Sequence, residues 1–277
     1  MTTIQIVTFN VLAPCWANPS SYPEGSRLDR VYRRGKIISV LQSLAPKTDF
    51  FCLQETTPTE YVQFAEALTD FTGVQVNHDS SYWSRYATEN PPWESNGVAL
   101  FIKKKVYSKP RFNTMINSDD GNHGAYAEMT HVKTGKKIGL VSIHLDSDTG
   151  GHRDKEFSAV LDFLKSRSVD ITLIGADLNY VTTSGPIKKG LEETGLVDLL
   201  GSLGIEKRTC PDIAGYTNST VYSTIDHLLV KGATPVTGDV IDNNLWNLYP
   251  DESDARLELN LQLSGSDHFP VWGQVRF

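Results

Sequence analysis

Short apolar runs that end in a polar residue or a turn signal recur along the chain, and they predict buried strands. Several of them alternate apolar and polar positions, which is the period of a strand with one buried face. The predicted strands cover 4–10, 49–55, 96–102, 124–132, 137–145, 171–177 and 223–230, and a last one ends at 277. The chain is therefore expected to be rich in β-sheet.

Amphipathic stretches between these strands predict helices, the first of them over 27–44. Its apolar side is formed by Leu28, Val31, Ile38 and Leu41, and a basic side, expected to face solvent, by Arg27, Arg30, Arg33, Arg34 and Lys36. Thr57-Pro58-Thr59-Glu60 is a capping box with proline at the first helical position, so a second helix begins there. Further helices are predicted at 153–165 and near 187–195, and loops at 70–96 and 243–264.

The segment Gly175–Asn179 places two polar side chains at the end of a buried strand. Residues two apart in an extended chain point the same way, so Asp177 and Asn179 face one site while Leu178 packs away from it. A buried carboxylate is costly unless it meets a cation, a hydrogen-bond donor or water. Taken alone, however, the pair also fits a cap followed by a turn.

The same arrangement of a polar side chain at a strand end occurs in six places. The residues are Asn10, Glu55, His144, Asp177, Asn179, Asp226, Asp267 and His268. Each has an ordinary structural explanation as a turn former, a cap or a hydrogen-bonded core histidine. Together they supply carboxylates and carboxamides, which suit Mg²⁺ or Mn²⁺, and histidines beside acids, which suit proton transfer. The absence of zinc-ligand spacing makes zinc the poorer expectation. The set predicts metal-dependent hydrolysis of a phosphate ester.

Composition narrows the class of protein without naming a substrate. With 277 residues, 39% hydrophobic and 21% charged, the chain is expected to form one domain over 1–277, and to be monomeric. A net charge of −7 disfavours a broad basic face for duplex DNA. Three cysteines without paired spacing, no leader and no long apolar run indicate a cytoplasmic protein that does not enter a membrane.

Aromatic residues gather in one of the predicted loops, where they suit contact with a substrate. They are Tyr82, Trp83, Tyr86 and Trp93. Aromatic side chains stack on unpaired bases, and long loops on rigid scaffolds often face substrate. An acidic chain with such a loop suits single-stranded RNA or DNA better than long duplex.

Six motifs, in this order along the chain, resemble those of the endonuclease/exonuclease/phosphatase superfamily. They are Thr8-Phe9-Asn10, Leu53-Gln54-Glu55, Ser142-Ile143-His144-Leu145, Gly175-Ala176-Asp177-Leu178-Asn179, Ile225-Asp226-His227 and Ser266-Asp267-His268. The resemblance implies the DNase I-like fold, an α/β protein built as a four-layer α/β/β/α sandwich of two mainly antiparallel sheets.

Within the superfamily the chain is most similar to the CCR4/nocturnin-like nuclease branch. The similarity lies in Asn10-Val11-Leu12-Ala13, Tyr22-Pro23, Cys52-Leu53-Gln54-Glu55 and Tyr216-Thr217-Asn218. Two positions differ from the branch: Ala176 precedes Asp177, and His227 stands where the branch usually has tyrosine.

The resemblance also implies a role for each residue. Glu55 is expected to be the main metal ligand, assisted by Asn10 and Asp267. Asp177 would position or activate the attacking water, or hold a second metal ion. His144 and Asn179 would donate to the phosphoryl oxygens, and His268 would act as the acid or base, oriented by Asp226. A histidine paired with a carboxylate is held in one tautomer and is a stronger base.

The expected function is therefore Mg²⁺-dependent hydrolysis of phosphodiester bonds in single-stranded RNA or DNA, with Mn²⁺ as a possible replacement ion. Three alternatives stay open. One is a phosphoesterase on an inositol phosphate, a lipid headgroup or a tyrosyl-DNA adduct. The second is an endonuclease for abasic DNA, which the acidic composition disfavours. The third is a scaffold without activity, which the complete set of expected residues disfavours.

Overall fold

Two six-stranded sheets pack face to face in the computed structural model, which describes residues 1–17, 19, 22, 24–78, 94–116, 123–147, 150–210, 224–248 and 253–277. Along the first sheet the order is β11 (Thr234–Val240), β12 (Val271–Arg276), β1 (Thr3–Asn10), β2 (Phe50–Thr56), β4 (Gly97–Lys103) and β3 (Phe71–Asn77). The second runs β5 (Arg111–Ile116), β6 (His123–Thr130), β7 (Lys137–His144), β8 (Ile171–Asp177), β10 (Asp226–Lys231) and β9 (Val197–Asp198).

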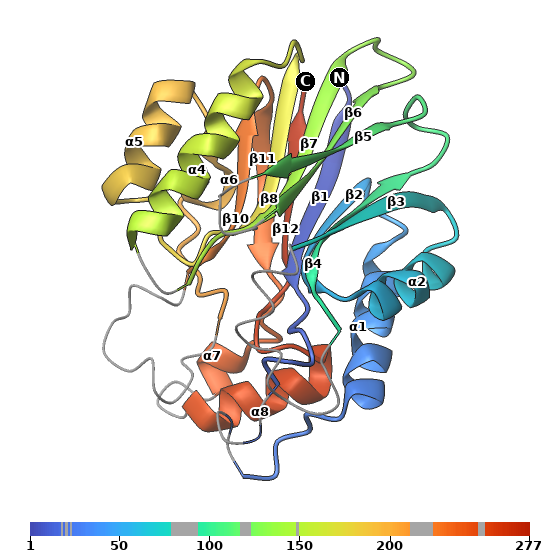
Figure 1. Ribbon diagram of the computed structural model, residues 1–277, viewed down its shortest axis with the longest axis vertical. Helices are drawn as coiled ribbons and strands as arrows, with labels where there is room; N and C mark the ends of the chain where they lie inside the picture. Colours follow the sequence, from blue (N-terminus) through green and yellow to red (C-terminus); the bar gives the residue numbers. More distant parts are fainter. Residues whose placement is uncertain are drawn as a thin grey trace.

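Helices cover the outer faces of both sheets (Figure 1). Those on the first sheet are α1 (Arg30–Leu44) and α2 (Pro58–Ala67), and those on the second are α4 (Gly150–Lys165) and α5 (Gly185–Thr194). The short α6 (Leu199–Ser202) contacts β10 and β11, and α7 (Leu245–Leu248) and α8 (Ser253–Ser264) lie at the end of the sandwich opposite the termini. Among the described helices, none combines the length and apolar character needed to cross a bilayer. The four layers confirm the predicted fold class.

Each sheet is antiparallel except at one pair of strands. Only β1 with β2 in the first sheet, and β7 with β8 in the second, run parallel within the described part of the chain. The mainly antiparallel character is thus as predicted. The two parallel pairs matter for function, because parallel neighbours deliver their carboxyl ends to the same edge of a sheet.

Side chains that alternate along each strand face opposite sides of the sheet and belong to different layers of the core. In β2, Phe51 and Leu53 pack with Phe64 of α2, whereas Phe50 and Cys52 face the space between the sheets. Helices α4 and α5 form the corresponding layer with the outer face of the second sheet. Side chains two apart share a face of a strand, so a buried strand serves two layers at once.

Gly175 allows the two sheets to approach closely beside the predicted motif of β8. A Cβ atom built at Gly175 would lie 2.4 Å from Cys52 Cβ and 3.0 Å from Thr8 Cβ, both on the facing sheet. Those atoms are attached to the backbones of β2 and β1 and cannot move without shifting the strands. The glycine therefore sets the spacing of the sheets just before Asp177.

We expect Gly175→Ala to lower the free energy of unfolding by about 1–3 kcal/mol, the usual cost of forcing a methyl group into a packed core. Urea unfolding monitored by circular dichroism measures this. Gly35→Ala is the matched control, because Gly35 lies within α1 and no atom beyond the backbone of its own helix would lie within 4 Å of an added Cβ. The control should be neutral or stabilising by about 0.5–1 kcal/mol. Equal stability of Gly175→Ala and the unsubstituted protein would contradict the packing argument.

Two segments predicted as loops form regular structure instead. Phe71–Asn77, inside the predicted loop 70–96, is the edge strand β3, and its middle positions are only partly buried, which weakens the apolar signal. Ser253–Ser264, inside the predicted loop 243–264, is helix α8. Its leucines occur at every second residue and resemble a strand, but Leu257 and Leu261 lie four residues apart and pack together against Leu12. Strands β5 and β11 were also not predicted.

Candidate active site

The eight residues expected at the site come together at one edge of the sandwich. Strand β1, which ends at Asn10, runs toward that edge, away from the chain termini (Figure 1). The parallel pairs deliver Asn10 beside Gln54 and His144 beside Asp177. Asp226, at the start of β10, lies opposite Asp177 in the antiparallel register. The spatial prediction drawn from the strand ends therefore agrees with the geometry.

Glu55 occupies a bulge that turns its side chain into the site. The pairing of β2 with β4 shifts register between Gln54 and Thr56, and Glu55 has a left-handed φ of 58°. Such a conformation is strained for a residue other than glycine and re-aims the side chain at a strand end. Its Oε2 accepts a 2.7 Å hydrogen bond from the backbone N–H of Ala13. The bulge and this bond fix the direction of the carboxylate.

Asn10 links two of the carboxylates. Its Nδ2 donates 2.9 Å hydrogen bonds to Glu55 Oε1 and to Asp177 Oδ2, while its Oδ1 accepts from the backbone N–H of Leu12 at 3.0 Å. A backbone N–H only donates, so this contact fixes which way the amide faces. Asn10 thus meets the carboxylates through its nitrogen, and its role as a metal ligand through Oδ1 stays a prediction.

Asp177, Asn179 and His144 form the second part of the site. The backbone N–H of Asn179, a residue with φ 49°, donates to Asp177 Oδ1 at 2.9 Å. Asn179 Nδ2 donates to the carbonyl of Leu145 at 2.8 Å and lies 3.0 Å from His144 Nε2. This contact holds the His144 ring beside Asn179. His144 Nε2 is also 3.6 Å from Asp177 Oδ2.

His268 and Asp226 form a buried histidine–carboxylate pair. His268 Nδ1 lies 2.8 Å from Asp226 Oδ2, so its Nε2 faces the interior of the site, 3.8 Å from Asp177 Oδ2 and 4.0 Å from Asp267 Oδ1. The pKa of His268 is raised well above its usual value. Burial lowers it, but the charge and hydrogen bond of Asp226, with the charges of Asp177 and Asp267, outweigh burial. The raised pKa favours the protonated form of the ring.

Burial and neighbouring charges separate the pKa values of two of the acids. The pKa of Glu55 is raised, chiefly by burial and also by the charge of Asp267, although His144 opposes the shift. For Asp177 burial also raises the pKa, but the charges of His144 and His268 and two hydrogen bonds lower it below its usual value. Asp177 therefore stays ionised, while an ionised Glu55 needs a further positive charge.

The donor set fits a divalent cation. Four buried carboxylates share the site, from Glu55, Asp177, Asp226 and Asp267, and two histidines accompany them. Donor atoms of Asp177, Asp226 and His268 also lie within 4.8 Å of one another, but the 2.8 Å bond already engages two of the three with each other. Glu55 and Asp267 are the better candidates for a hard cation, because oxygen ligands suit Mg²⁺ and Mn²⁺.

Two side chains absent from the predicted set hold this edge together. Tyr22 donates a 3.0 Å hydrogen bond to Asp267 Oδ2. Arg33 was predicted on the solvated side of the first helix, and this is wrong: it is 1% exposed and donates to the carbonyls of Leu12 at 2.9 Å and Gly265 at 2.9 Å. Its spacing of four residues from Ile37 was the available signal, since both share the buried face of α1.

Removing the Arg33 guanidinium should leave buried carbonyl oxygens without donors. We expect Arg33→Met to lower the free energy of unfolding by about 3 kcal/mol, since each unsatisfied buried polar group costs about 1–3 kcal/mol. Urea unfolding of this variant beside Arg34→Met, which changes the next residue of the same helix, makes the comparison. A loss at Arg33 no larger than that at Arg34 would contradict the assigned role.

His78 is a further buried histidine beside the site, in the range predicted as a loop. Its ring lies 6.5 Å from that of His144, and its Nδ1 accepts from the backbone N–H of His123 at 3.2 Å. Burial, together with the charges of His144 and His123, lowers the pKa of His78 to about 3. His78 is therefore a neutral neighbour of the site.

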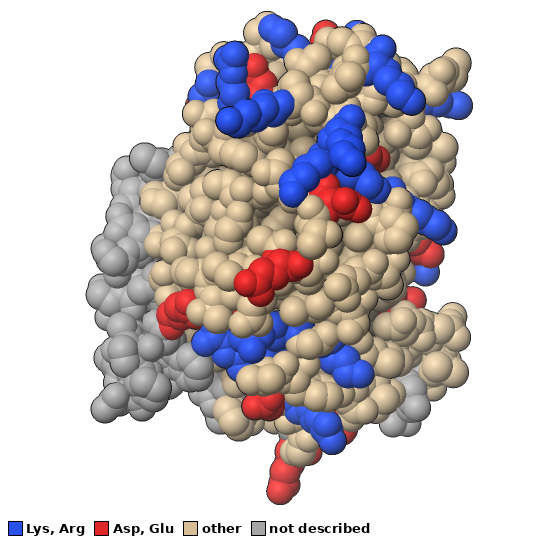
Figure 2. Space-filling model, turned by 90° about the vertical axis from the view of Figure 1, so that its right-hand side faces the viewer, with Lys and Arg blue, Asp and Glu red and all other residues tan. Residues whose placement is uncertain are grey.

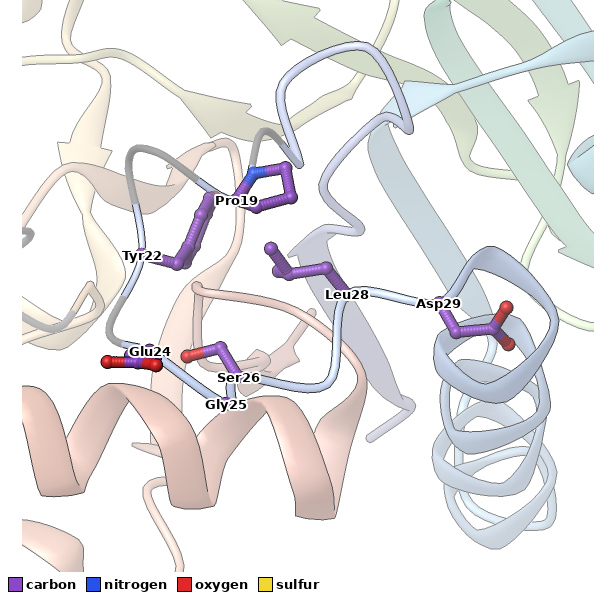
Figure 3. Close-up of a pocket in the computed structure, with 7 residues that line it drawn as sticks. All are labelled: Pro19, Tyr22, Glu24, Gly25, Ser26, Leu28 and Asp29. Atoms are coloured by element: carbon purple, nitrogen blue, oxygen red, sulfur yellow. The ribbon is translucent and has the colours of Figure 1, made fainter.

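A pocket of about 430 Å³ lies beside Tyr22, between the start of α1 and α8 (Figure 3). Pro19, Tyr22, Glu24, Gly25, Ser26, Leu28 and Asp29 line it. It adjoins the site through Tyr22, which contacts Asp267. The aromatic residues Tyr82, Trp83, Tyr86 and Trp93, together with Pro23 and Tyr216-Thr217-Asn218, lie outside the described residues.

Comparisons with known proteins place the chain in a family. The model of the Endonuclease/Exonuclease/phosphatase family matches residues 7–268. A search of curated protein sequences finds no match. Among solved structures, the human Nocturnin catalytic domain with bound sulfate is similar at 16% identity and a TM-score of 0.72, over 99% of this chain and 94% of that one.

Two other solved structures show the same fold. D. rerio TDP2 complexed with single strand DNA product has 16% identity and a TM-score of 0.64, over 100% of both chains. The Bacteroides thetaiotaomicron mannosyl-6-phosphatase has 15% identity and a TM-score of 0.62, over 99% of this chain and 100% of that one. Likeness at this level of identity establishes the fold alone. With the family model matching nearly the whole length, the chain belongs to the endonuclease/exonuclease/phosphatase family, whose members hydrolyse phosphoester bonds.

Proposed function

We propose that the protein is a Mg²⁺-dependent phosphodiesterase that acts as a nuclease on single-stranded RNA or DNA, with Mn²⁺ able to replace Mg²⁺. The observation that carries this proposal is the buried His268–Asp226 pair, whose free ring nitrogen faces Asp177 within a group of carboxylates. A proton-transfer group and a site for a cation then lie side by side, as phosphoester hydrolysis requires.

Glu55 and Asp267 would hold the cation, with Asn10 fixing the direction of Glu55. A bound Mg²⁺ would neutralise charge on the phosphoryl oxygens. Asp177, kept ionised by its neighbours, orients the attacking water and accepts its proton. As the bond between phosphorus and the leaving oxygen breaks, His268 supplies a proton from Nε2 to that oxygen, while Asp226 holds the ring in position.

His144 and Asn179 complete the site as donors to the phosphoryl group. Both protons of the Asn179 amide are engaged, one with the carbonyl of Leu145 and the other with His144 Nε2. Binding of a phosphoryl oxygen would replace the contact with His144 and bring both Asn179 Nδ2 and His144 Nε2 against the phosphoryl group. Donors aimed at the developing charge contribute most when they are already fixed in place.

Three features support a single-stranded substrate. The net charge is −7, and the face in Figure 2 carries lysine and arginine in separate groups with acidic residues between them. Long duplex generally requires a continuous basic surface. The aromatic residues Tyr82, Trp83, Tyr86 and Trp93, in a segment that the sequence predicts to be a loop, suit stacking on unpaired bases. A zebrafish protein of the same fold was solved with a single-stranded DNA product.

The test is product analysis on 5′- and 3′-labelled RNA and DNA strands with Mg²⁺, with Mn²⁺ or with EDTA. We expect shortened strands with either metal ion and none with EDTA. Parallel reactions contain an inositol phosphate, a lipid headgroup ester, a tyrosyl-DNA adduct, an abasic duplex and mannose 6-phosphate, the last because a phosphatase for mannosyl-6-phosphate shares the fold. Turnover of one of these and not of the oligonucleotides would replace the nuclease proposal by that activity.

A further inference from the structure

His227 and Asp198 form a second buried histidine–aspartate pair, which has no role in the hydrolysis proposed above. His227 follows Asp226 along β10, so the two side chains point to opposite faces of the strand. His227 is 3% exposed, and its Nδ1 lies 2.8 Å from Asp198 Oδ2. The pair therefore lies on the far side of the strand from His268.

Both ring nitrogens of His227 face acceptors. Nδ1 faces the carboxylate of Asp198, and Nε2 lies 3.0 Å from the carbonyl oxygen of Tyr180 and 3.1 Å from that of Thr224. Carboxylates and carbonyls only accept hydrogen bonds, so each nitrogen must carry a proton to satisfy this environment. His227 is a buried imidazolium with three fixed partners.

The two carbonyls bonded by Nε2 belong to segments that carry site residues. Tyr180 directly follows Asn179, which contacts Asp177 and His144. Thr224 lies two residues before Asp226, the partner of His268. One side chain thus bridges the segment that leaves β8 and the segment that enters β10.

The carboxylate of Asp198 is itself fixed by further contacts. Its Oδ2 accepts from Thr182 Oγ1 at 2.7 Å, and its Oδ1 accepts from the backbone N–H of Gly201 at the start of α6. Thr182 belongs to the same segment as Tyr180, so the imidazolium and its counter-ion both hold that segment. A group fixed at both ends can hold the backbone in one position.

We propose that His227 is a positioning residue: through its Nε2–H it fixes the carbonyls of Tyr180 and Thr224, and so sets the distance between Asn179 and the His268–Asp226 pair. The proposal rests on the hydrolytic function assigned to that pair. We call the two hydrogen bonds from His227 Nε2–H to these carbonyls the clamp. Misplacement of catalytic groups by about 1 Å can cost about 10²-fold in rate, so loss of the clamp should affect turnover more than substrate binding.

Two isosteric replacements separate the clamp from the ion pair. In His227→Asn the amide nitrogen takes the place of Nδ1 and keeps the contact with Asp198, but the clamp is lost. In His227→Gln the amide nitrogen takes the place of Nε2 and keeps the clamp. Both variants lose the buried charge. We expect kcat on bis(p-nitrophenyl) phosphate with Mg²⁺ to fall about 10- to 100-fold in His227→Asn, with KM within about twofold, and to fall less in His227→Gln.

His131→Asn is the control, because His131 is a buried histidine at the β6–β7 turn and packs against Phe277 near the C-terminus, away from the site. Its kcat should equal that of the unsubstituted protein. Urea unfolding of the three variants measures the loss of stability. Equal kcat in the Asn and Gln variants of His227 would overturn the positioning role. So would a loss of kcat that is proportional, across the three variants, to the loss of unfolding free energy.

Amide hydrogen exchange tests the clamp without any activity. We expect faster exchange at 178–182 and 224–226 in His227→Asn than in His227→Gln, and unchanged exchange would overturn the inference. If the unsubstituted protein hydrolyses no phosphoester, the proposed function fails while the exchange result still decides the clamp. If it is active and His227→Asn turns over equally fast, the inference fails alone.

Discussion

Replacement of His268 by Ala is expected to lower kcat by about 10²–10⁴-fold, the usual contribution of a positioned acid or base. The imidazole would donate from Nε2 because Asp226 engages Nδ1 and raises the pKa of the ring against the effect of burial. Steady-state hydrolysis of a labelled single strand measures the loss. KM should change little, since the proton is needed in the transition state and not for binding.

The His268 result needs a check on folding, because the substitution leaves the buried carboxylate of Asp226 without its partner. Breaking a buried ion pair costs about 3–5 kcal/mol, which can unfold a marginal protein. His268→Asn places an amide nitrogen where Nδ1 lies, keeps the contact with Asp226, and should fold while remaining as inactive as His268→Ala. Activity near that of the unsubstituted protein in a folded His268 variant would refute the assignment.

Substitution of Glu55 by Gln is expected to weaken Mn²⁺ binding strongly. Loss of a residue that only hydrogen-bonds to a metal ligand already weakens metal affinity by about 10- to 100-fold, and loss of the ligand itself should weaken it more. The amide matches the carboxylate in shape but lacks its charge. Mn²⁺ titration by calorimetry measures the change. Glu66→Gln, on the exposed side of α2, is the matched control and should bind normally. Unchanged affinity in Glu55→Gln would exclude Glu55 as the main ligand.

The change in stability of Glu55→Gln in the absence of metal can also be predicted. Burial and the charge of Asp267 raise the pKa of Glu55 in the folded protein. A raised pKa means that folding disfavours the carboxylate, so ionised Glu55 lowers stability when the pH exceeds its unfolded pKa. In EDTA at neutral pH, Glu55→Gln should therefore be as stable as the unsubstituted protein or more so. A marked loss of stability would show that the carboxylate supports the fold without an ion.

The fold was predictable from the sequence where one signal dominated. Buried runs such as Ile171–Asp177 are apolar on both faces, and the capping box at Thr57 marks a helix start in four residues. Helix α8 was missed because its leucines alternate, and only the tertiary contact of Leu257 with Leu12 favours the helix. The edge strand β3 was missed because a half-exposed strand carries little apolar signal.

The proximity of the eight side chains was predictable because strand ends from six parts of the chain carry one kind of chemistry. The internal geometry of the site was not predictable from the sequence. The orientation of Asn10 depends on the backbone N–H of Leu12, and the direction of Glu55 depends on a bulge in its pairing with β4. Arg33 and His227 were placed by contacts with carbonyl oxygens far away in the sequence. Such contacts leave no periodic pattern to read.

We propose that side chains from these strand ends surround a catalytic cation. The most direct test is a crystal structure of the protein soaked in Mn²⁺, with the ion located by its anomalous scattering. We expect a peak within about 2.0–2.4 Å of a Glu55 oxygen, with Asp267 also contributing an oxygen ligand. A peak confined to other residues, or no peak beside Glu55 at saturating Mn²⁺, would contradict it.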